Sequence, residues 1–111
     1  RAGIRYFATT DVEEAKDRLR MASFTVMLTD LVLDTTDGIE LFLWARRRHP
    51  LLRGICASAF LDQDKLQRVI AAGFDDCLIK PVHSDRLIPS IRSSLALYQR
   101  WQGLLGRLQP A

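Results

Sequence analysis

Hydrophobic positions along the chain follow two alternating spacings. Short runs of apolar and β-branched residues recur, such as FTVMLTD at 24–30, and runs of this length are typical of strands buried in a parallel sheet. Between these runs, apolar residues return every three or four positions, which places them on one face of a helix. The predicted strands are 4–9, 24–30, 53–59 and 75–81, and the predicted helices are 11–21, 39–49, 64–74 and about 86 to at least 100.

Local signals mark the ends of the predicted helices. Thr10 and Glu13 have the spacing of a capping box, in which two side chains satisfy backbone N–H groups at a helix start. The pair Ser84-Asp85 predicts a cap for the last helix. Pro50 stops the second helix, and Gly73 suits the left-handed position that closes the third.

The alternation of strands and helices predicts the fold class. Four βα units follow one another without a repeat or a linker, which favours a doubly wound α/β fold with a parallel sheet and helices on both faces. We expect a single domain over 1–111, in which 84–111 forms a long C-terminal helix that continues as a linker. In such folds the functional site lies at the carboxyl ends of the strands.

The composition fits a globular domain. The 111 residues are 48% hydrophobic and 26% charged, which supplies a core and excludes the disordered class. No apolar run approaches the roughly 18 residues that span a membrane. Cys56 and Cys77 each lie inside an apolar run, so we expect buried, reduced thiols in a cytoplasmic protein rather than a disulfide or a metal pair.

The net charge of +3 does not by itself indicate a nucleic-acid partner. The densest basic cluster is Arg46-Arg47-Arg48 before His49, at the end of a predicted helix, where positive charge is favoured. No aromatic residues alternate with these arginines, so a solvated helix end is favoured over a nucleic-acid surface.

Three chemically active side chains stand where successive predicted strands end. Asp30, Ser58 and Lys80 bring a carboxylate, a hydroxyl and an ammonium group to one edge of the sheet. A carboxylate can attack phosphorus and form an acyl phosphate, while the other two groups hold phosphoryl oxygens. Each residue alone also fits a structural role: a turn cap, a small strand end and a surface charge. Their joint placement favours a phosphoryl-accepting site.

Several motifs carry a family resemblance. They are the run DLVL at 30–33 with Gly38 eight residues after the aspartate, the run ASA at 57–59, and AGFDDCLIKP at 72–81. With these motifs the chain, to about residue 98, resembles the receiver domain of bacterial response regulators, the module of two-component signalling. The resemblance implies a flavodoxin-like sheet.

The resemblance also implies roles for individual residues. Asp30 corresponds to the phosphoryl acceptor, Ser58 to the hydroxyl that closes on the phosphoryl group, and Lys80 to the invariant lysine. Asp30 and the backbone carbonyl of Val32 correspond to ligands of Mg²⁺. The phosphoryl donor would be a histidine kinase or a phosphotransfer protein, phosphorylation would reshape the face formed by the last helices and strands, and nucleic acid would be reached only through a separate output domain.

Three features depart from the family pattern. The family's first strand, first helix and Mg²⁺-binding acidic pair are missing ahead of 4–9, and the chain opens at Arg1 rather than Met, so we expect an N-terminally shortened receiver. Asp34 stands where the family usually has proline, and it is a further candidate metal ligand. Cys77 replaces the usual switching aromatic. With so few ligands we expect weak or absent Mg²⁺ binding and poor phosphorylation of this chain.

The missing strand would be the central one in the family's strand order, 2-1-3-4-5. Its absence would leave the predicted strands 4–9 and 24–30 about 10 Å apart. The two strands could pair directly, a second copy could fill the gap by strand exchange, or further N-terminal residues could supply the strand. Because an open hydrophobic edge promotes aggregation, a monomer with an empty gap is disfavoured.

Apolar residues of the last helix form two stripes. One is expected to face the sheet and consists of Leu87, Ile88, Ile91, Leu95 and Tyr98. The other has the spacing of a coiled-coil seam and consists of Leu97, Trp101, Leu104 and Leu108. The second stripe predicts either a contact with a partner or second copy, giving a homodimer, or the frayed start of a linker.

Two functions therefore remain open. The chain is either a receiver that accepts a phosphoryl group on Asp30, or a degenerate receiver that takes no phosphate and serves as an interaction or dimerisation module. An enzyme of the same fold class is disfavoured, because the sequence has no histidine base and no glycine-rich cofactor loop.

Overall fold

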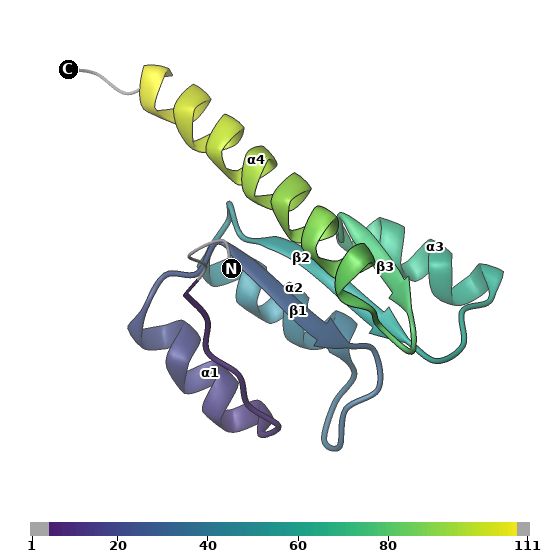
Figure 1. Cartoon of the computed structure of the whole chain (residues 1–111). Helices are drawn as coiled ribbons and strands as arrows, with labels where there is room; N and C mark the ends of the chain where they lie inside the picture. The colour runs from purple at the N-terminus through teal and green to yellow at the C-terminus, as the bar shows by residue number, and fades with distance from the viewer. Residues whose placement is uncertain (1–4, 109–111) are drawn as a thin grey trace.

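The computed structural model describes residues 5–108 (Figure 1). Its elements are α1 (Val12–Met21), β1 (Val26–Asp30), α2 (Gly38–Arg48), β2 (Arg53–Ser58), α3 (Gln63–Ala72), β3 (Asp76–Ile79) and α4 (Ser84–Leu108). In this part of the chain the strands form one parallel sheet in the order β1-β2-β3. α4 crosses one face of the sheet, and α2 and α3 lie on the other (Figure 1). The predicted α/β architecture is confirmed.

β2 is the central strand, and the core forms around it. Its residues from Gly54 to Ser58 are buried. A β-carbon on Gly54 would lie 2.5 Å from the ring of Phe42, so only glycine allows α2 to approach this closely. Two clusters of buried side chains result, one of Leu19, Phe42, Ala45 and Leu52 and the other of Leu31, Ile39, Cys56 and Val69.

The predicted strand 4–9 is wrong for residues 5–9, while residue 4 lies outside the described range. Residues 5–9 have no strand structure and pair with no strand. An extended segment becomes a strand only where a neighbour takes up its backbone hydrogen bonds, and β1 is two strand spacings away in the expected order. Direct pairing with β1 therefore does not occur, and the outer edge of β1 has no strand within residues 5–108.

The prediction that 24–30 is buried on both faces is also wrong. β1 begins at Val26, and Leu28 is 47% exposed. Leu28 pairs with Ile55, so its side chain lies on the same side of the sheet as that of Ile55, the side that α4 covers only in part.

Two of the predicted helix caps are wrong, and one helix end is confirmed. Asp11 rather than Thr10 caps α1, because its carboxylate accepts the Glu13 N–H at 2.9 Å, and a carboxylate is the stronger acceptor. Ser84 is the first residue of α4 rather than its cap. Gly73 closes α3 in the left-handed region with φ 94°, as predicted.

Polar contacts attach α4 to the sheet. The five residues of its predicted sheet-facing stripe are only partly buried, whereas Ser90 and Ser94 are buried. Ser94 Oγ donates to Asp75 Oδ2 at 2.9 Å, and Ser90 Oγ donates to Asp76 Oδ2 at 2.7 Å. Asp75 also forms a two-pronged ion pair with Arg53, and both side chains are nearly buried.

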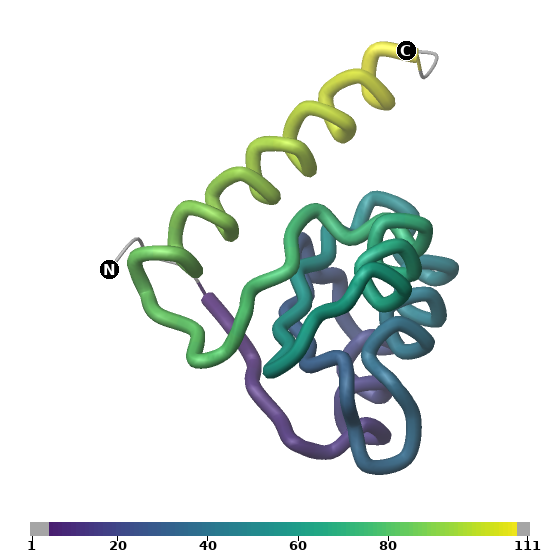
Figure 2. The backbone as a smooth tube through the Cα atoms, turned by 90° about the vertical axis from the view of Figure 1, so that its right-hand side faces the viewer, coloured from purple at the N-terminus to yellow at the C-terminus, as the bar shows by residue number. Residues whose placement is uncertain are grey.

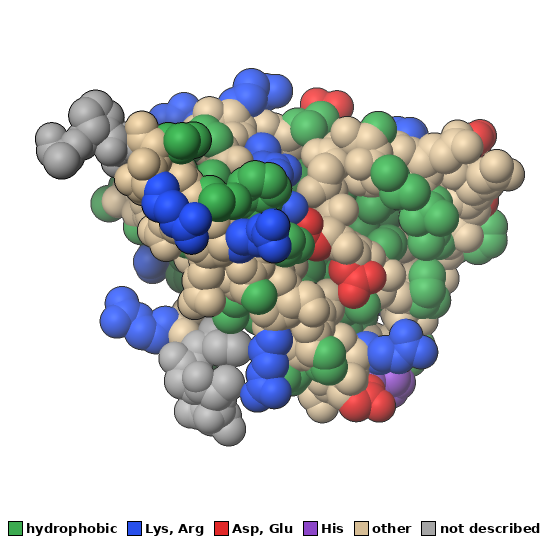
Figure 3. Space-filling view, turned by 90° about the horizontal axis from the view of Figure 1, so that it is seen from above, with side chains coloured by type: hydrophobic (Ala, Val, Ile, Leu, Met, Phe, Trp, Pro, Cys, Tyr) green, Lys and Arg blue, Asp and Glu red, His purple; other side chains and the backbone are tan. Residues whose placement is uncertain are grey.

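Two surfaces of the described chain remain uncovered. The second half of α4 projects beyond the sheet (Figure 2). Apolar side chains also gather on the side of the molecule that carries α3 (Figure 3). That exposed set, which we call the α3 face, consists of Phe60, Leu66, Ile70 and Ile79. No helix in the described range is both long and apolar enough to cross a membrane.

Asp75 makes the stability of the fold depend on pH. Burial alone would raise the pKa of this carboxyl, but the hydrogen bonds from Arg53 and Ser94 outweigh burial, so its pKa lies below the ordinary value. A carboxyl with a lowered pKa stabilises the fold above its ordinary pKa. That contribution is lost as the pH falls through the lowered value.

We therefore expect Asp75→Asn to lower the free energy of unfolding at neutral pH by roughly 1–3 kcal/mol. The difference from wild type should begin to shrink below about pH 4, where the carboxyl of the unfolded wild-type chain becomes protonated, and should be lost as the folded carboxyl protonates at lower pH. Urea unfolding across this pH range measures both effects. Asp34→Asn, at an exposed loop position, is the control and should match wild type. An equal loss for Asp75→Asn at acidic and neutral pH would contradict the linkage.

Candidate functional site

An ion pair joins two of the three predicted site residues. Lys80 Nζ lies 3.0 Å from Asp30 Oδ2, and both side chains are about half exposed. Asp30 ends β1, and Lys80 follows the last residue of β3. An ion pair this exposed contributes at most about 1 kcal/mol to stability. Lys80 is therefore free to follow a negative charge that develops near Asp30.

The ion pair spans the central strand, and a small residue makes this possible. Asp30 pairs in register with Ala57 of β2, and Ala57 pairs with Leu78 of β3. Lys80 lies two residues after Leu78, so its side chain emerges on the same side of the sheet as Asp30. The methyl group of Ala57 leaves room for the lysine to reach across. In the sequence, the run ASA indicates Ser58 as a site residue. The residue of that run that indicates the contact between Asp30 and Lys80 is Ala57, because its side chain is small.

Ser58 lies at the same edge of the sheet, but its hydroxyl does not contact Asp30 or Lys80. Because side chains alternate along a strand, Ser58 points to the opposite side from Ala57. Its Oγ donates to the Phe60 carbonyl at 2.6 Å and accepts the Phe60 N–H at 3.3 Å. The predicted trio is thus present at one edge, and the Lys80 N–H donates to the Ser58 carbonyl at 2.9 Å, but only the side chains of Asp30 and Lys80 are in contact.

The loop after Asp30 folds back onto the strand that it leaves. Gly38 N donates to Leu31 O at 2.9 Å, and a β-carbon on Gly38 would lie 2.0 Å from the Asp30 carbonyl oxygen. Asp37 caps α2 by accepting the Glu40 N–H at 2.8 Å, and it pairs with Arg68 at 3.2 Å. Glycine at position 38 is therefore required to hold α2 against the backbone of Asp30, a role its spacing alone does not reveal.

The described residues do not form a Mg²⁺ site. No group of three His, Cys, Asp or Glu residues within 5–108 is placed to hold a metal ion. The carboxylate of Asp30 is paired with Lys80, Val32 is bridged to Asp37, and Asp34 is exposed in the loop between them. Mg²⁺ requires near-octahedral oxygen ligands, and one paired carboxylate with a loop carbonyl falls short of that set.

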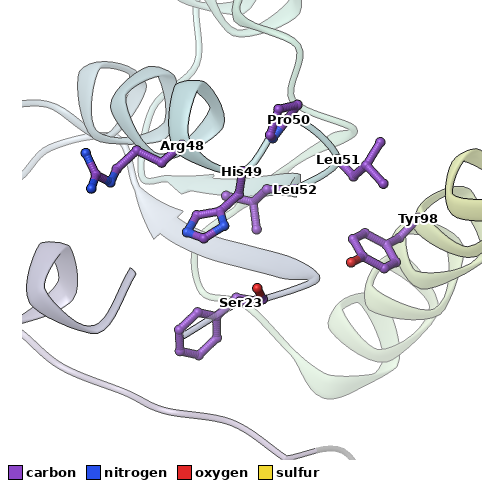
Figure 4. Close-up of a pocket in the computed structure, with 8 residues that line it drawn as sticks. Ser23, Arg48, His49, Pro50, Leu51, Leu52 and Tyr98 are labelled. Atoms are coloured by element: carbon purple, nitrogen blue, oxygen red, sulfur yellow. The ribbon is translucent and has the colours of Figure 1, made fainter. Parts of the chain in front are cut away.

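A separate hollow lies at the opposite ends of the strands. It has a volume of about 180 Å³ and is lined by residues that precede β1 and β2 and by Tyr98 of α4 (Figure 4). His49 Nε2 lies 2.6 Å from the Leu19 carbonyl oxygen. No carboxylate lines this hollow, so it lacks the group that the predicted phosphoryl chemistry needs.

Comparison with known proteins identifies the family. The model of the response regulator receiver domain matches residues 1–92. Response regulator protein PilR of Pseudomonas aeruginosa is 31% identical over 87 residues, which cover 78% of this chain and 20% of PilR. Virulence sensor protein BvgS of Bordetella pertussis is 34% identical over 103 residues, which cover 85% of this chain and 8% of BvgS. The chain spans a fifth or less of the length of these two relatives.

Solved structures share the fold. The signal receiver domain of a Luxo repressor protein from Vibrio parahaemolyticus superposes with a TM-score of 0.80 at 22% identity, covering 88% of this chain and 75% of that chain. The chemotaxis protein CheY4 of Vibrio cholerae gives 0.77 at 22% identity, covering 85% and 80%. These likenesses establish a CheY-like, flavodoxin-like fold. With the family match over residues 1–92, they show that this chain belongs to the response regulator receiver domain family.

Proposed function

We propose that this receiver domain accepts a phosphoryl group on Asp30. The observation that carries the proposal is the half-exposed Asp30–Lys80 ion pair at the carboxyl edge of the sheet. A carboxylate oxygen of Asp30 would attack the phosphorus of a phosphohistidine. The new O–P bond forms as the P–N bond breaks, and the imidazole nitrogen keeps the electron pair and then takes a proton. The donor would be a histidine kinase or a phosphotransfer protein.

Lys80 and Ser58 would stabilise the product. The phosphoryl group adds negative charge beside Asp30, and Lys80 Nζ is close enough to move from the carboxylate to a phosphoryl oxygen. Ser58 would have to leave the Phe60 carbonyl and turn its hydroxyl toward the same group. In this proposal Asp30 is the nucleophile, Lys80 neutralises charge, and Ser58 reports the modification to the loop before α3.

Treatment with acetyl phosphate and Mg²⁺ tests this assignment. We expect intact mass spectrometry to show a slow and partial gain of one phosphoryl group, because Asp30 is exposed and paired with a cation but the described Mg²⁺ ligands are few. The gain should disappear in Asp30→Asn and persist in Asp64→Asn, which changes an exposed carboxylate on α3. An adduct that persists in Asp30→Asn would place the acceptor elsewhere.

Mg²⁺ binding to this chain should be weak, because the described ligands are too few. A titration followed by Trp44 and Trp101 fluorescence, with calorimetry as a second readout, should not saturate below millimolar Mg²⁺. Asp34→Asn should weaken binding further if this loop carboxylate supplies a ligand, whereas Asp64→Asn on α3 should not. Saturation at micromolar Mg²⁺ would contradict the expectation.

A degenerate receiver is the second candidate function. It is favoured by the lack of a metal-ligand cluster within residues 5–108 and by the exposed α3 face. Such a domain would bind a partner protein through this apolar surface without chemistry at Asp30. Absence of any adduct, in a chain whose fold is intact, would favour this candidate over phosphorylation.

The cellular setting is also a proposal. Both cysteines are free thiols, which suit the cytoplasm, but the prediction that both are buried is wrong for Cys77, which is only partly buried. Relatives include the DNA-binding transcriptional regulator NtrC of Klebsiella pneumoniae, of which this chain covers 22%. A comparable output domain would lie outside the segment described, and contact with nucleic acid would pass through it.

We further propose that α4 mediates a homodimer. Three residues of the predicted seam are exposed, Leu97 (37%), Trp101 (47%) and Leu108 (83%), while Leu104 is partly buried. The seam lies on the second half of α4, which projects beyond the sheet (Figure 2), and beyond the family match, which ends at residue 92. A second copy offers the same apolar stripe and would bury both.

Light scattering on Trp101→Ala tests the dimer. We expect a dimeric mass for wild type, a monomeric mass for Trp101→Ala, and a dimeric mass for Gln102→Ala, which changes an exposed residue of the same turn. A dimer that survives Trp101→Ala would overturn the α4 interface and would favour strand exchange at the open edge of β1.

A further inference from the structure

Cys56 and Cys77 are direct neighbours across two parallel strands. They are register partners of β2 and β3, so their side chains emerge on the same side of the sheet. Cys56 is fully buried in the cluster with Leu31, Ile39 and Val69, and Cys77 is partly buried and packs against the same cluster. These are the two cysteines of the sequence, and both are free thiols.

The register of β2 and β3 places the two cysteines at an α-carbon separation that a disulfide can span. Neighbouring strands lie about 4.7–4.9 Å apart, while a relaxed disulfide has its α-carbons about 4.4–6.8 Å and its β-carbons about 3.5–4.5 Å apart. The α-carbon separation is therefore suitable, and the β-carbons need only a small approach. A bond closed in this way is strained, and strained disulfides are the more easily reduced ones.

The surroundings give the two thiols different roles. Burial raises the pKa of Cys56, and the neighbouring Cys77 raises it further. The Cys56 thiol also donates to the Asp76 carbonyl oxygen at 3.7 Å. Cys56 therefore stays protonated and shielded, whereas Cys77 is the thiol that an oxidant reaches first.

We propose that Cys56 and Cys77 form a reversible intramolecular disulfide when a hydroperoxide oxidises the domain. The Cys77 sulfur, as thiolate, attacks the outer peroxide oxygen. The O–O bond breaks, Cys77 becomes a sulfenic acid, and the alkoxide leaves and takes a proton. The Cys56 sulfur then attacks the Cys77 sulfur, the S–O bond breaks, and water leaves with the Cys56 proton. Two thiols lose two electrons in total, and the peroxide gains them.

The disulfide would act on the strands that carry the phosphoryl site. Cys56 lies two residues before Ser58, and Cys77 lies three residues before Lys80. Drawing β2 and β3 together on the side that α3 covers changes the strand ends from which both site residues emerge. The proposal does not depend on phosphorylation, because thiol chemistry is measured on the chain whether or not Asp30 accepts a phosphoryl group.

Oxidation of the whole chain with stoichiometric hydrogen peroxide tests the proposal. After quenching, denaturation and alkylation, we expect a monomer that has lost two hydrogens and carries no alkyl group. Millimolar glutathione should restore two alkylatable thiols. Two thiols that survive oxidation would overturn the proposal, as would a covalent dimer. A bond that glutathione cannot reduce would overturn its reversibility.

Single variants separate the two thiols. In Cys56→Ala, Cys77 should stop at the sulfenic acid, which dimedone traps. In Cys77→Ser, a change at a partly exposed position, Cys56 should stay alkylatable after the same treatment. If Cys56 in Cys77→Ser is oxidised as fast as in wild type, the assigned order of attack is wrong. If wild-type Cys77 is oxidised while Cys56 remains alkylatable, the pair does not form a disulfide.

Discussion

The central strand carries small side chains where its neighbours need room, and the rest of the fold depends on this. Gly54 admits the ring of Phe42, so that α2 packs directly on the sheet. Ala57 leaves the space across which Lys80 reaches Asp30. Between them, Cys56 fills the core beneath α3 without displacing Val69. A larger residue at any of these positions would separate layers that the core or the site needs in contact, because protein interiors have little free volume.

The attachment of α4 follows a different principle from that of α2 and α3. Helices α2 and α3 bury apolar side chains against the sheet, whereas α4 buries two serines that donate to Asp75 and Asp76. Hydrogen bonds have strict geometry, so they fix the position of α4 along the strands more closely than apolar contact would. The same contacts place Asp75 and Arg53 in a nearly buried ion pair, whose loss would leave a charge without a partner.

Much of this fold could be predicted from the sequence, because local signals and tertiary packing agree over most of the chain. The apolar runs at 53–59 and 75–81, and the glycine at 73, each correspond to an element that forms. The prediction failed where a local pattern needed a partner that the chain does not offer. The run 4–9 has the composition of a strand, but its described residues, 5–9, have no neighbouring strand within 5–108 for their backbone groups. On α4, the helical periodicity predicted that apolar residues would face the sheet. No local sequence signal indicated that Ser90 and Ser94 would be the buried residues.

The same limit explains what could be predicted of the site. The shared edge of Asp30, Ser58 and Lys80 could be predicted from the predicted strand ends, because the carboxyl ends of parallel strands all lie at one edge of the sheet. Which side chains touch depends on the alternation of side chains along each strand and on the register between strands. These two features place Asp30 and Lys80 on one side of the sheet and Ser58 on the other.

The position of Ser58 suggests how a signal at Asp30 would reach a surface far from α4. Its hydroxyl is bonded to the Phe60 carbonyl, and Lys65 Nζ donates to the same oxygen at 3.0 Å. If a phosphoryl group on Asp30 draws Ser58 across the strand end, Phe60 loses one of these two partners. Phe60 belongs to the exposed α3 face, and Lys65 lies on α3 itself. The helix whose apolar residues are already exposed would therefore be the first to respond. Cys56 and Cys77 pack against the side of α3 that faces the core. Oxidation of these thiols would therefore act on α3 from the core, whereas phosphorylation of Asp30 would act on it through the loop that precedes it.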